Sequence, residues 1–503
     1  MPYRTLADFL EELGRDGELA RVDAEVSPSL EVAEISRRMA RQEGPALLFG
    51  AAAGHDLPVL TQLLGTEPRI CRALGVESLG EAAARMERLL RTAEPDGWFD
   101  RLRVGAAAGP LGGLTPRQVK SGACQQVVRL GSDVNLEELP LLQSSSEETG
   151  RTISAATVLT AEPDSHGRVA GRYDLVLLGR DRLAVCWPAH EEPARLVREY
   201  GRREGRMPLA VVLGGDPACW LAASAAVSPA IDPWALAGLL RERPIDLVAC
   251  RSVDLAVPAE TDIVLEGYVD PAEPPVAGGP LCAVGGYMSP PWSAPVLHVT
   301  AVTHRANPIY RAVVSCAMPN EACVADRALS QIFLPLARLA IPELVDYDLP
   351  LFGAARHWAV LAIRKSYAGQ ARRVASIAWG MRQFLFAKLL VIVDEGVDVR
   401  DARQVLGAMA ARANPGRDLF FQEGPPDPLD PAAVPGSLGQ KMAVDATAKL
   451  AEEAGGTLSE PATIGRETRD LVTGRWEQYG LGVEGGEGGE NAKCKMQNAK
   501  CKM

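Results

Sequence analysis

The middle of the chain, from residue 118 to residue 304, carries a succession of short apolar runs, and this succession constrains the fold more than any other feature. Two runs, 173–178 and 183–187, are separated only by Gly-Arg-Asp-Arg, which is typical of a β-hairpin. Further runs with strand character lie at 209–213, 245–249, 263–269 and 296–302. So many short strands, interrupted by helical spacing at 193–201 and 233–242, predict a β-barrel or a β-sandwich.

Helical and strand patterns alternate on both sides of this region. On the N-terminal side, residues 6–13, 30–39 and 86–90 have helical spacing, and residues 46–50 and 58–62 form short strand-like runs. On the C-terminal side, predicted helices at 325–339, 371–388 and 402–411 alternate with predicted strands at 359–365 and 389–394. This alternation predicts a parallel sheet flanked by helices. Residues 440–453 are predicted as a last helix, which can reach a second subunit and in which Lys441 and Asp445 form an i, i+4 pair.

These patterns divide the chain into four segments. We expect the α/β fold class, with an N-terminal α/β lobe at 1–115, a barrel at 116–308, a C-terminal α/β domain with the terminal helix at 309–455, and an extension at 456–503. The extension ends in NAKCKMQNAKCKM, a seven-residue repeat without apolar periodicity. This tail is predicted to be disordered and to carry no part of the function.

Composition excludes several classes of function. The formal net charge of −11 argues against a nucleic-acid partner, because phosphate binding needs a basic face. No apolar run is long enough to span a bilayer, and the charged amphipathic N-terminus is not a signal peptide, so we expect a cytoplasmic protein. The ten cysteines show neither metal nor disulfide spacing, and all except Cys494 and Cys501 in the tail are predicted to be buried, reduced thiols.

Five segments that follow one another along the chain carry a more specific signal. They are RMPLAVVLGGDPA at 206–218, PIDLVACRSVDLAVPA at 244–259 with DIVLEGYVDP at 262–271, IFLPLARLAIPELVD at 332–346, KLLVIVDEGVDVRD at 388–401 and GSLGQKMAVDAT at 436–447. In this order they resemble the UbiD decarboxylase family, the polyprenyl-hydroxybenzoate carboxy-lyases and their relatives. The resemblance covers most of residues 1–455 and implies a central split β-barrel, like that of flavin reductases, between two α/β parts.

The same resemblance implies an activity and a cofactor. Members of the family carry out reversible, non-oxidative decarboxylation of aromatic or α,β-unsaturated acids with prenylated FMN. A divalent metal, commonly manganese, and a potassium ion hold the cofactor phosphate. An arginine flanked by two glutamates handles the proton that replaces CO2. The resemblance also implies a small-molecule carboxylic acid as ligand, and homodimers or higher oligomers.

The positions that match the proton-handling residues hold other side chains here. In VAGRYDLVLLG at 169–179, Asp174 stands where the resemblance places the arginine. In VAGGPLCAVGGY at 276–287, Gly278 and Ala283 stand where it places the two glutamates. Arg172 lies two residues before Asp174, so the two side chains share a face of the predicted strand and Arg172 is a partial substitute. No catalytic residue of the family is therefore matched.

The positions that match the metal ligands are altered as well. Val169 stands for an asparagine and Pro233 for a glutamate, and only His190 keeps a residue type that binds metal. Asp232, next to Pro233, is either a neighbouring acid or a helix N-cap before proline, and we favour the cap. Lys388 matches a lysine near the cofactor phosphate, or it favours the C-terminus of a preceding helix. His190 and Lys388 are thus the candidate cofactor-binding residues.

The sequence leaves three hypotheses open. The chain is a divergent carboxy-lyase in which the cofactor does the covalent work, and water, His190 or Asp174 supplies the proton. Alternatively, it is a non-catalytic subunit that forms a hetero-oligomer with an intact UbiD-like chain, or a module that binds plain FMN or a small acid without turnover. We expect that the unaided chain does not decarboxylate the usual aromatic or cinnamic-type acids.

Overall fold

The computed structural model describes residues 3–92, 114–165, 167–227, 231–283, 285–316, 318–354, 356–433, 438–454 and 464–480. The chain forms two compact units, Met1–Ala448 and Lys449–Met503. The second unit contains the helices α14 (Ala451–Ala454) and α15 (Arg466–Gly474) and a 3-10 helix at Trp476–Tyr479. The elements described below belong to the first unit. Among the described residues, no helix has the length and apolar character that crossing a membrane requires.

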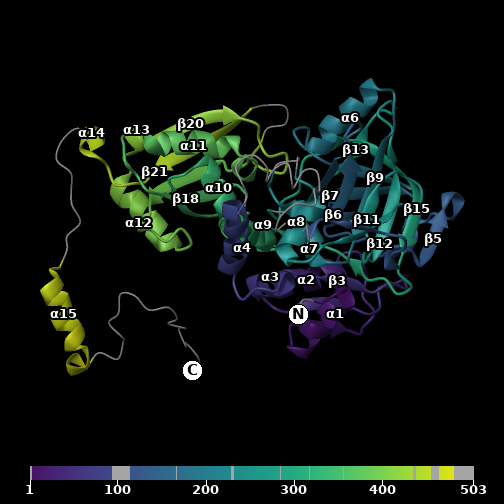
Figure 1. Cartoon of the computed structure of the whole chain (residues 1–503), viewed down its shortest axis with the longest axis horizontal. Helices are drawn as coiled ribbons and strands as arrows, with labels where there is room; N and C mark the ends of the chain where they lie inside the picture. Colours follow the sequence, from purple (N-terminus) through teal and green to yellow (C-terminus); the bar gives the residue numbers. More distant parts are fainter. Residues whose placement is uncertain are drawn as a thin grey trace. The chain divides into compact units, whose positions relative to one another are not determined.

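The central part of the sequence forms a closed antiparallel barrel of six strands (Figure 1). The strands, in spatial order, are β12 (Ile263–Val269), β9 (Met207–Leu213), β6 (Thr152–Ala161), β7 (Arg168–Gly179), β8 (Arg182–Cys186) and β15 (Val296–His304). Pairing between β12 and β15 closes the barrel, and β5 (Val127–Leu130) pairs with β15 outside it. The barrel confirms the prediction made from the succession of short apolar runs.

Strand β7 shows how the sequence builds both faces of the barrel wall. Val169, Tyr173 and Leu175 are buried and belong to the barrel core. Arg172 and Asp174, which lie between them, are half-buried on the opposite face. This alternation follows from the two-residue period of an extended strand. Arg172 and Asp174 therefore share a face, as their spacing predicts.

The N-terminal residues form a small sheet that the chain completes after the barrel. In this sheet β1 (Leu19–Val22), β2 (Ala46–Phe49) and β3 (Val59–Thr61) are joined by β16 (Tyr310–Arg311). The helices of this region are α1 (Leu6–Arg15), α2 (Glu31–Arg41), α3 (Glu67–Leu74) and α4 (Leu79–Thr92). A capping box formed by Thr5 and Asp8 starts α1, and the apolar face of that helix is buried.

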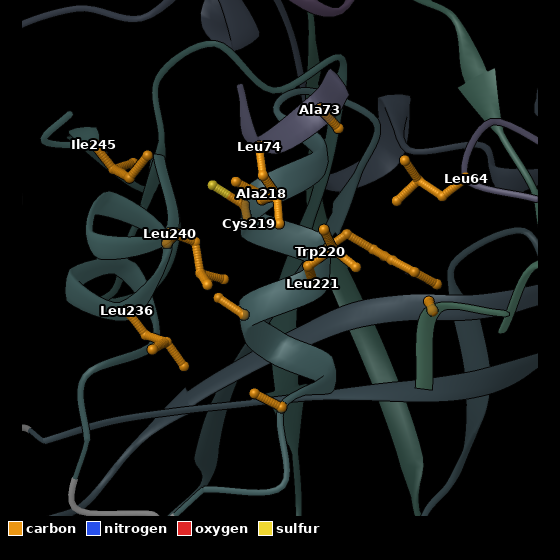
Figure 2. Packing of buried hydrophobic residues seen from close by; sticks show 14 of the residues in the cluster. Leu64, Ala73, Leu74, Ala218, Cys219, Trp220, Leu221, Leu236, Leu240 and Ile245 are labelled. Carbon is orange, nitrogen blue, oxygen red and sulfur yellow. The ribbon is translucent and has the colours of Figure 1, made fainter. Parts of the chain in front are cut away.

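Two short helices, α7 (Pro217–Ser224) and α8 (Pro233–Arg241), lie almost entirely within the hydrophobic core (Figure 2). Each begins with an aspartate cap followed by proline, which has no N–H group to leave unsatisfied. At α8, the Asp232 carboxylate accepts hydrogen bonds from the N–H groups of Trp234 at 2.9 Å and Ala235 at 3.0 Å. The predicted helix cap is confirmed.

The C-terminal part of the first unit is a five-stranded sheet with helices on both faces. Its order is β17 (Leu344–Asp348), β18 (Trp358–Ile363), β19 (Leu389–Asp394), β21 (Gly439–Asp445) and β20 (Leu419–Gly424). The inner strands β18, β19 and β21 run parallel. Apolar residues of α11 (Gln370–Gly380) pack on one face and those of α12 (Ala402–Arg412) on the other. The apolar run of β19 is thus covered on both sides, as is usual in parallel sheets, and the predicted α/β class is confirmed.

Three predictions about this part are wrong. Residues 439–445 form β21 and not a helix, because pairing with β19 and β20 overrides their helical spacing. Lys441 and Asp445 are therefore strand residues, and the predicted terminal helix does not form there. The helix predicted at 371–388 ends at Gly380, a residue that disfavours helix. The helix predicted at 325–339 is broken between α9 (Glu321–Ile332) and α10 (Leu334–Ala340), next to Pro335.

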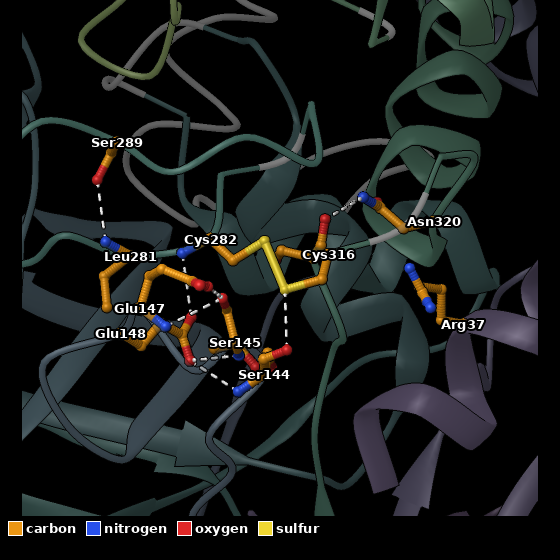
Figure 3. The surroundings of a disulfide bond; sticks show 12 residues. Arg37, Ser144, Ser145, Glu147, Glu148, Leu281, Cys282, Ser289, Cys316 and Asn320 are labelled. Carbon is orange, nitrogen blue, oxygen red and sulfur yellow. Dashed lines mark hydrogen bonds between the residues drawn. A yellow bond between two sulfur atoms is a disulfide. The ribbon is translucent and has the colours of Figure 1, made fainter. Parts of the chain in front are cut away.

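One pair of cysteines also departs from the prediction. Cys282 and Cys316 form a disulfide, with Cα atoms 5.6 Å apart, that joins the loop after β13 (Val276–Gly278) to the segment before α9 (Figure 3). Beside it, the Glu148 carboxylate accepts from the backbone N–H groups of Ser144 at 2.7 Å and Cys282 at 3.0 Å. The prediction of reduced thiols is wrong for these two cysteines, because folding brings together residues 34 positions apart.

Candidate functional site

A cavity of about 200 Å³ lies where β7, α7, α9 and the segment after α11 meet. We call it the arginine cavity, because Arg172, Arg356 and Arg382 are in its wall. The larger residues among the rest of its lining are acidic, aromatic or apolar, apart from the amide of Gln383: Glu191, Asp326, His190, Tyr173, Phe333, Tyr347, Phe386, Leu329, Leu349 and Leu385. The wall therefore combines cationic and acidic side chains with aromatic and apolar ones.

Arg172 connects the barrel to α9. Its guanidinium donates to both carboxylate oxygens of Asp326, at 2.9 and 3.0 Å, and to the Ser224 hydroxyl at 3.3 Å. The same guanidinium lies 4.9 Å from the centre of the Trp220 ring. The side chains of Arg172 and Asp326 are only 14% and 21% exposed. A largely buried bidentate pair of this kind fixes the geometry of the wall.

A second group of side chains surrounds the Glu191 carboxylate. Its Oε2 atom accepts from Arg382 Nη2 at 2.6 Å and from the Tyr173 hydroxyl at 3.0 Å. Its Oε1 atom lies 3.7 Å from His190 Nε2. Burial, together with the charge of Glu191, raises the pKa of Tyr173 well above its usual value, so the hydroxyl stays protonated and donates. Glu191 therefore lies at the point where polar groups from three segments of the chain converge.

Arg356 and His190 flank the ring of Phe386. The Arg356 guanidinium lies 5.1 Å from the centre of this ring, and the His190 ring meets it edge-on at 4.9 Å. Arg356 also pairs with Asp427 at 2.8 Å, and His357 is 3.0 Å from the same carboxylate. Burial lowers the pKa of His190 more than Glu191 and Asp427 raise it, so His190 is mostly neutral at pH 7.

An anion that enters the cavity meets three guanidinium groups, each of which already has a carboxylate partner. The described wall of the cavity contains three arginines but two carboxylates, Glu191 and Asp326, and a neutral histidine. Arg382 is the most accessible of the three arginines, with 38% of its side chain exposed against 26% for Arg356 and 14% for Arg172. A guanidinium carries five N–H donors, so Arg382 can bind a further oxygen beyond Glu191.

Comparison with known proteins gives the family. Models of the 3-octaprenyl-4-hydroxybenzoate carboxy-lyase domains match residues 10–89 (N-terminal domain), 117–318 (Rift-related domain) and 323–446 (C-terminal domain). The chain belongs to the UbiD family. An uncharacterized protein of Aquifex aeolicus is 36% identical over 95% of this chain and 99% of its own length. One from Archaeoglobus fulgidus is 36% identical over 90% of this chain and 93% of its own length.

Solved UbiD structures resemble the chain through most of its length. The closed form of Sedimentibacter hydroxybenzoicus vanillic acid decarboxylase, ShVdcCD, has a TM-score of 0.84 at 25% identity, covering 95% of this chain and 99% of that one. The UbiD-class enzyme HmfF from Pelotomaculum thermopropionicum in complex with FMN has a TM-score of 0.73 at 27% identity, covering 91% and 97%. An evolved dimeric HmfF with prFMN has a TM-score of 0.74 at 26% identity, covering 93% and 98%.

The two positions that the resemblance assigns to metal ligands, Val169 and Pro233, lie together in a separate hollow, which we call the apolar hollow. Val169 and Pro233 line this hollow together with Ala225, Ile231 and Leu236, and its volume is only about 20 Å³. It is a different cavity from the one that His190 lines. The apolar hollow is the place to test whether a divalent metal fits.

The side chains of the apolar hollow do not fit a divalent metal. Val169 and Pro233 bring no side-chain oxygen, nitrogen or sulfur, and Glu192 is the one carboxylate in the described lining, whereas a divalent cation needs several such ligands. Two cationic side chains, Arg168 and Arg382, line the same hollow, and the nearby Asp232 carboxylate is 2.5 Å from Arg168. Within the described ranges, no three His, Cys, Asp or Glu side chains are grouped to hold a metal ion.

The matched glutamate positions lie outside the described lining of the arginine cavity. Gly278 ends β13 and is paired with Trp292 of β14 (Trp292–Ala294). A Cβ atom on Gly278 would lie 3.0 Å from the indole nitrogen of Trp292, so the indole occupies the space that a longer side chain needs. Ala283 is 3% exposed and follows Cys282 in the disulfide-linked loop.

Asp174, at the matched arginine position, does not belong to the described lining of the arginine cavity. It is paired across β7 and β8 with Cys186. Burial raises the pKa of the Cys186 thiol, and the charge of Asp174 raises it further. Cys186 and Trp292 belong to one small apolar cluster. Asp174 therefore lies beside the packed side chains of this cluster.

His190 and Lys388, the predicted cofactor-binding residues, lie in different cavities. His190 lines the arginine cavity, whereas Lys388 lines another of about 280 Å³ and donates to both oxygens of Asp430, at 2.7 and 2.9 Å. Phe386 lines both cavities. The helix before Lys388 ends at Gly380, so its explanation as a helix C-terminal cation is wrong. Its role at a cofactor phosphate stays a prediction.

Sequence reasoning missed four residues of this site: Glu191, Asp326, Arg356 and Arg382. They come from four segments that only folding brings together, and none stands in a motif that predicts binding. Glu191 had one usable signal, since it directly follows His190 and precedes the first residue of α6 (Glu192–Arg202). Asp326, Arg356 and Arg382 had none.

Proposed function

We propose that this chain is a UbiD-family protein that binds a planar, anionic ligand of the flavin mononucleotide type in the arginine cavity, and that it decarboxylates acids slowly or not at all. The observation that carries the proposal is a wall that contains Arg172, Arg356 and Arg382 together with Phe333 and Phe386. Guanidinium groups bind anionic oxygens, and aromatic side chains pack against flat rings. The FMN and prFMN complexes of HmfF support this choice of ligand.

The expectation of weak turnover rests on the groups available to move a proton. Replacing CO2 by hydrogen requires an acid of suitable pKa close to the reacting carbon. The described wall offers the Tyr173 hydroxyl, which already donates to Glu191, and the neutral His190. Losing a positioned acid lowers a rate roughly 10²–10⁴-fold. A prenylated flavin, when bound, supplies the covalent activation of the acid. The side chains here bind and orient such a group but supply no matched acid.

Co-expression with a prenyl-flavin synthase in the cytoplasm, where we expect the protein to act, tests this proposal. We expect the purified chain to show flavin absorbance, and turnover of aromatic and cinnamic-type acids at least about 100-fold below that of an intact UbiD enzyme assayed alongside. A colourless protein that binds no added flavin contradicts the binding function. Turnover equal to that of the intact enzyme, and abolished by His190→Ala, contradicts the expectation of weak activity.

A subunit role in a hetero-oligomer is the second candidate, and one comparison favours it. The vanillic acid decarboxylase structures are described as ShVdcCD, and one of them contains a truncated ShVdcD. By analogy, the partner here is an intact UbiD-like chain with which this chain assembles. Affinity purification of the tagged chain, co-expressed with such a homologue, tests the assembly. A stoichiometric complex with raised decarboxylase activity supports it, and a homodimer that excludes the homologue contradicts it.

A further inference from the structure

Glu191 holds the position that an incoming anion would need. One of its oxygens accepts from both Arg382 and Tyr173, and the other lies 3.7 Å from His190. A phosphate or carboxylate oxygen of a ligand would be attracted to the same donors. The Glu191 side chain is 16% exposed, and its carboxylate already accepts from these donors. The protein's own carboxylate therefore occupies the position beside Arg382 where such an anion would bind.

Arg382 is the cavity arginine best able to exchange its partner. Arg172 donates to both oxygens of Asp326 through one nitrogen and to Ser224 through another, and Arg356 is paired with Asp427, whose side chain is 2% exposed. Arg382 donates to Glu191 and is the most exposed of the three. Exchanging one carboxylate for another anion keeps the guanidinium paired, and the displaced Glu191 carboxylate, now 16% exposed, then has to turn towards solvent.

The lining of the apolar hollow indicates whether a metal ion or a guanidinium supplies the positive charge for a phosphate. Val169 and Pro233 provide no metal ligand, but Arg382 lines this hollow as well as the arginine cavity. Fixed positive charge at the junction of the two cavities therefore comes from a guanidinium. A planar guanidinium matches the oxygens of a phosphate monoester directly, without a bridging cation.

We propose that Arg382 is the receptor for the phosphate of the flavin-type ligand, that this contact needs no metal ion, and that Glu191 is a built-in competitor which must release Arg382 before the phosphate binds. This inference rests on the proposed function, because it names how the same cavity recognises its ligand. If it holds, substitutions of the two paired residues change the affinity for FMN in opposite directions. Arg382→Met removes the receptor, whereas Glu191→Gln removes the competing charge and keeps an acceptor for Tyr173.

Binding of FMN and of riboflavin, which lacks the phosphate, to the purified full-length protein tests the inference by flavin fluorescence or calorimetry. Each titration is run in EDTA and again with added MnCl2. We expect the FMN dissociation constant to agree within about twofold between the two conditions, and riboflavin to bind at least about tenfold more weakly than FMN. Arg382→Met should weaken FMN binding about 10–100-fold and leave riboflavin binding unchanged.

Glu191→Gln should strengthen FMN binding about tenfold. Arg202→Met is the matched control, since Arg202 is 73% exposed and pairs with Glu199 on the surface of α6, and it should bind FMN like the wild type. Thermal unfolding of each variant shows whether it is folded. Weaker FMN binding by Glu191→Gln would show that Glu191 positions Arg382 and does not compete, which overturns the inference. FMN binding that requires manganese also overturns the inference, but it leaves the proposed flavin-binding function intact. Failure to bind flavin in any condition contradicts both the inference and the proposed function.

Discussion

The arginine cavity and the apolar hollow share Tyr173 and Arg382, yet they differ in character. The cavity measures about 200 Å³ and holds ion-paired arginines, whereas the hollow measures about 20 Å³ and has Val169 and Pro233 in its wall. Both contain residues of β7, whose neighbouring side chains point to opposite faces. The difference teaches that the barrel fixes where side chains point, while the identity of each side chain decides the chemistry available there.

The two regions should also respond differently to substitution. In the apolar hollow, Val169, Ala225, Ile231 and Leu236 offer hydrocarbon contacts, so a polar group placed among them must reach Arg168, Glu192 or Arg382 or remain without a partner. Around the arginine cavity, each charge is tolerated because its partner is present, so removal of one partner leaves the other uncompensated. This difference can be tested by substitutions in the arginine cavity or in the apolar hollow.

The largest effect is expected at the ion pair behind the arginine cavity. Arg356→Met should lower the free energy of unfolding by about 3–5 kcal/mol, because the buried Asp427 carboxylate then loses its cationic partner. Urea unfolding measures this loss. The double variant Arg356→Met/Asp427→Asn is the control and should recover most of it. A loss below about 1 kcal/mol would mean that the Arg356–Asp427 pair behaves like an ion pair on the surface. The arginine cavity and the apolar hollow would then not differ in how they respond to substitution.

The same pair predicts a dependence on pH. Burial would raise the pKa of Asp427, but Arg356 and His357 outweigh it and hold the pKa at about 2. Because an unfolded aspartate has a pKa of about 3.9, the lowered value stabilises the fold above that pH and this stability is lost as the pH falls towards 2. The difference in unfolding free energy between wild type and Asp427→Asn should shrink by about 2 kcal/mol over that range. A constant difference would show that the pairing does not favour the ionised carboxylate.

The sequence predicted those parts of the fold that depend on local pattern. The β7–β8 hairpin, the buried strand β19 and the Asp232 cap each follow from neighbouring residues, and each is confirmed. Strand β21 was mistaken for a helix because its identity depends on pairing with β19 and β20, which lie elsewhere in the sequence. The Cys282–Cys316 disulfide was missed for the same reason.

The site was less predictable than the fold. His190 was found because it stands in a stretch that resembles the family, but the sequence gives no signal for Asp326, Arg356 or Arg382. The small residue at Gly278 has a physical explanation only once Trp292 is seen to occupy the adjoining space. The resemblance indicated, position by position, where this chain has a different side chain from the family pattern. The neighbouring side chains that account for such a residue, as Trp292 does for Gly278, come from other strands.

Placing an asparagine at position 169 tests the apolar side of the comparison. Val169→Asn puts an amide into a hollow lined by Ala225, Ile231 and Leu236, and should lower the free energy of unfolding by roughly 1–2 kcal/mol. Added manganese should not raise the melting temperature of either wild type or variant. Val169→Ala is the control, since it removes packing without adding a polar group. A melting temperature that rises with manganese in the variant alone would show that one ligand is enough to make the hollow a metal site.

The smallest effect is expected at Tyr173, which belongs to both regions. Tyr173→Phe keeps the ring in the barrel core beside Trp187 and removes only the hydroxyl that donates to Glu191 at 3.0 Å, so the free energy of unfolding should fall by about 1 kcal/mol. Tyr173→Ala removes the ring as well and should cost about 3–5 kcal/mol by the same urea unfolding measurement. Equal losses for the two variants would mean that the contact with Glu191, and not the packing of the ring, holds β7 at this point. In that case Tyr173 would contribute to stability through its polar contact in the arginine cavity, and it would be grouped with the charged residues there and not with the apolar hollow.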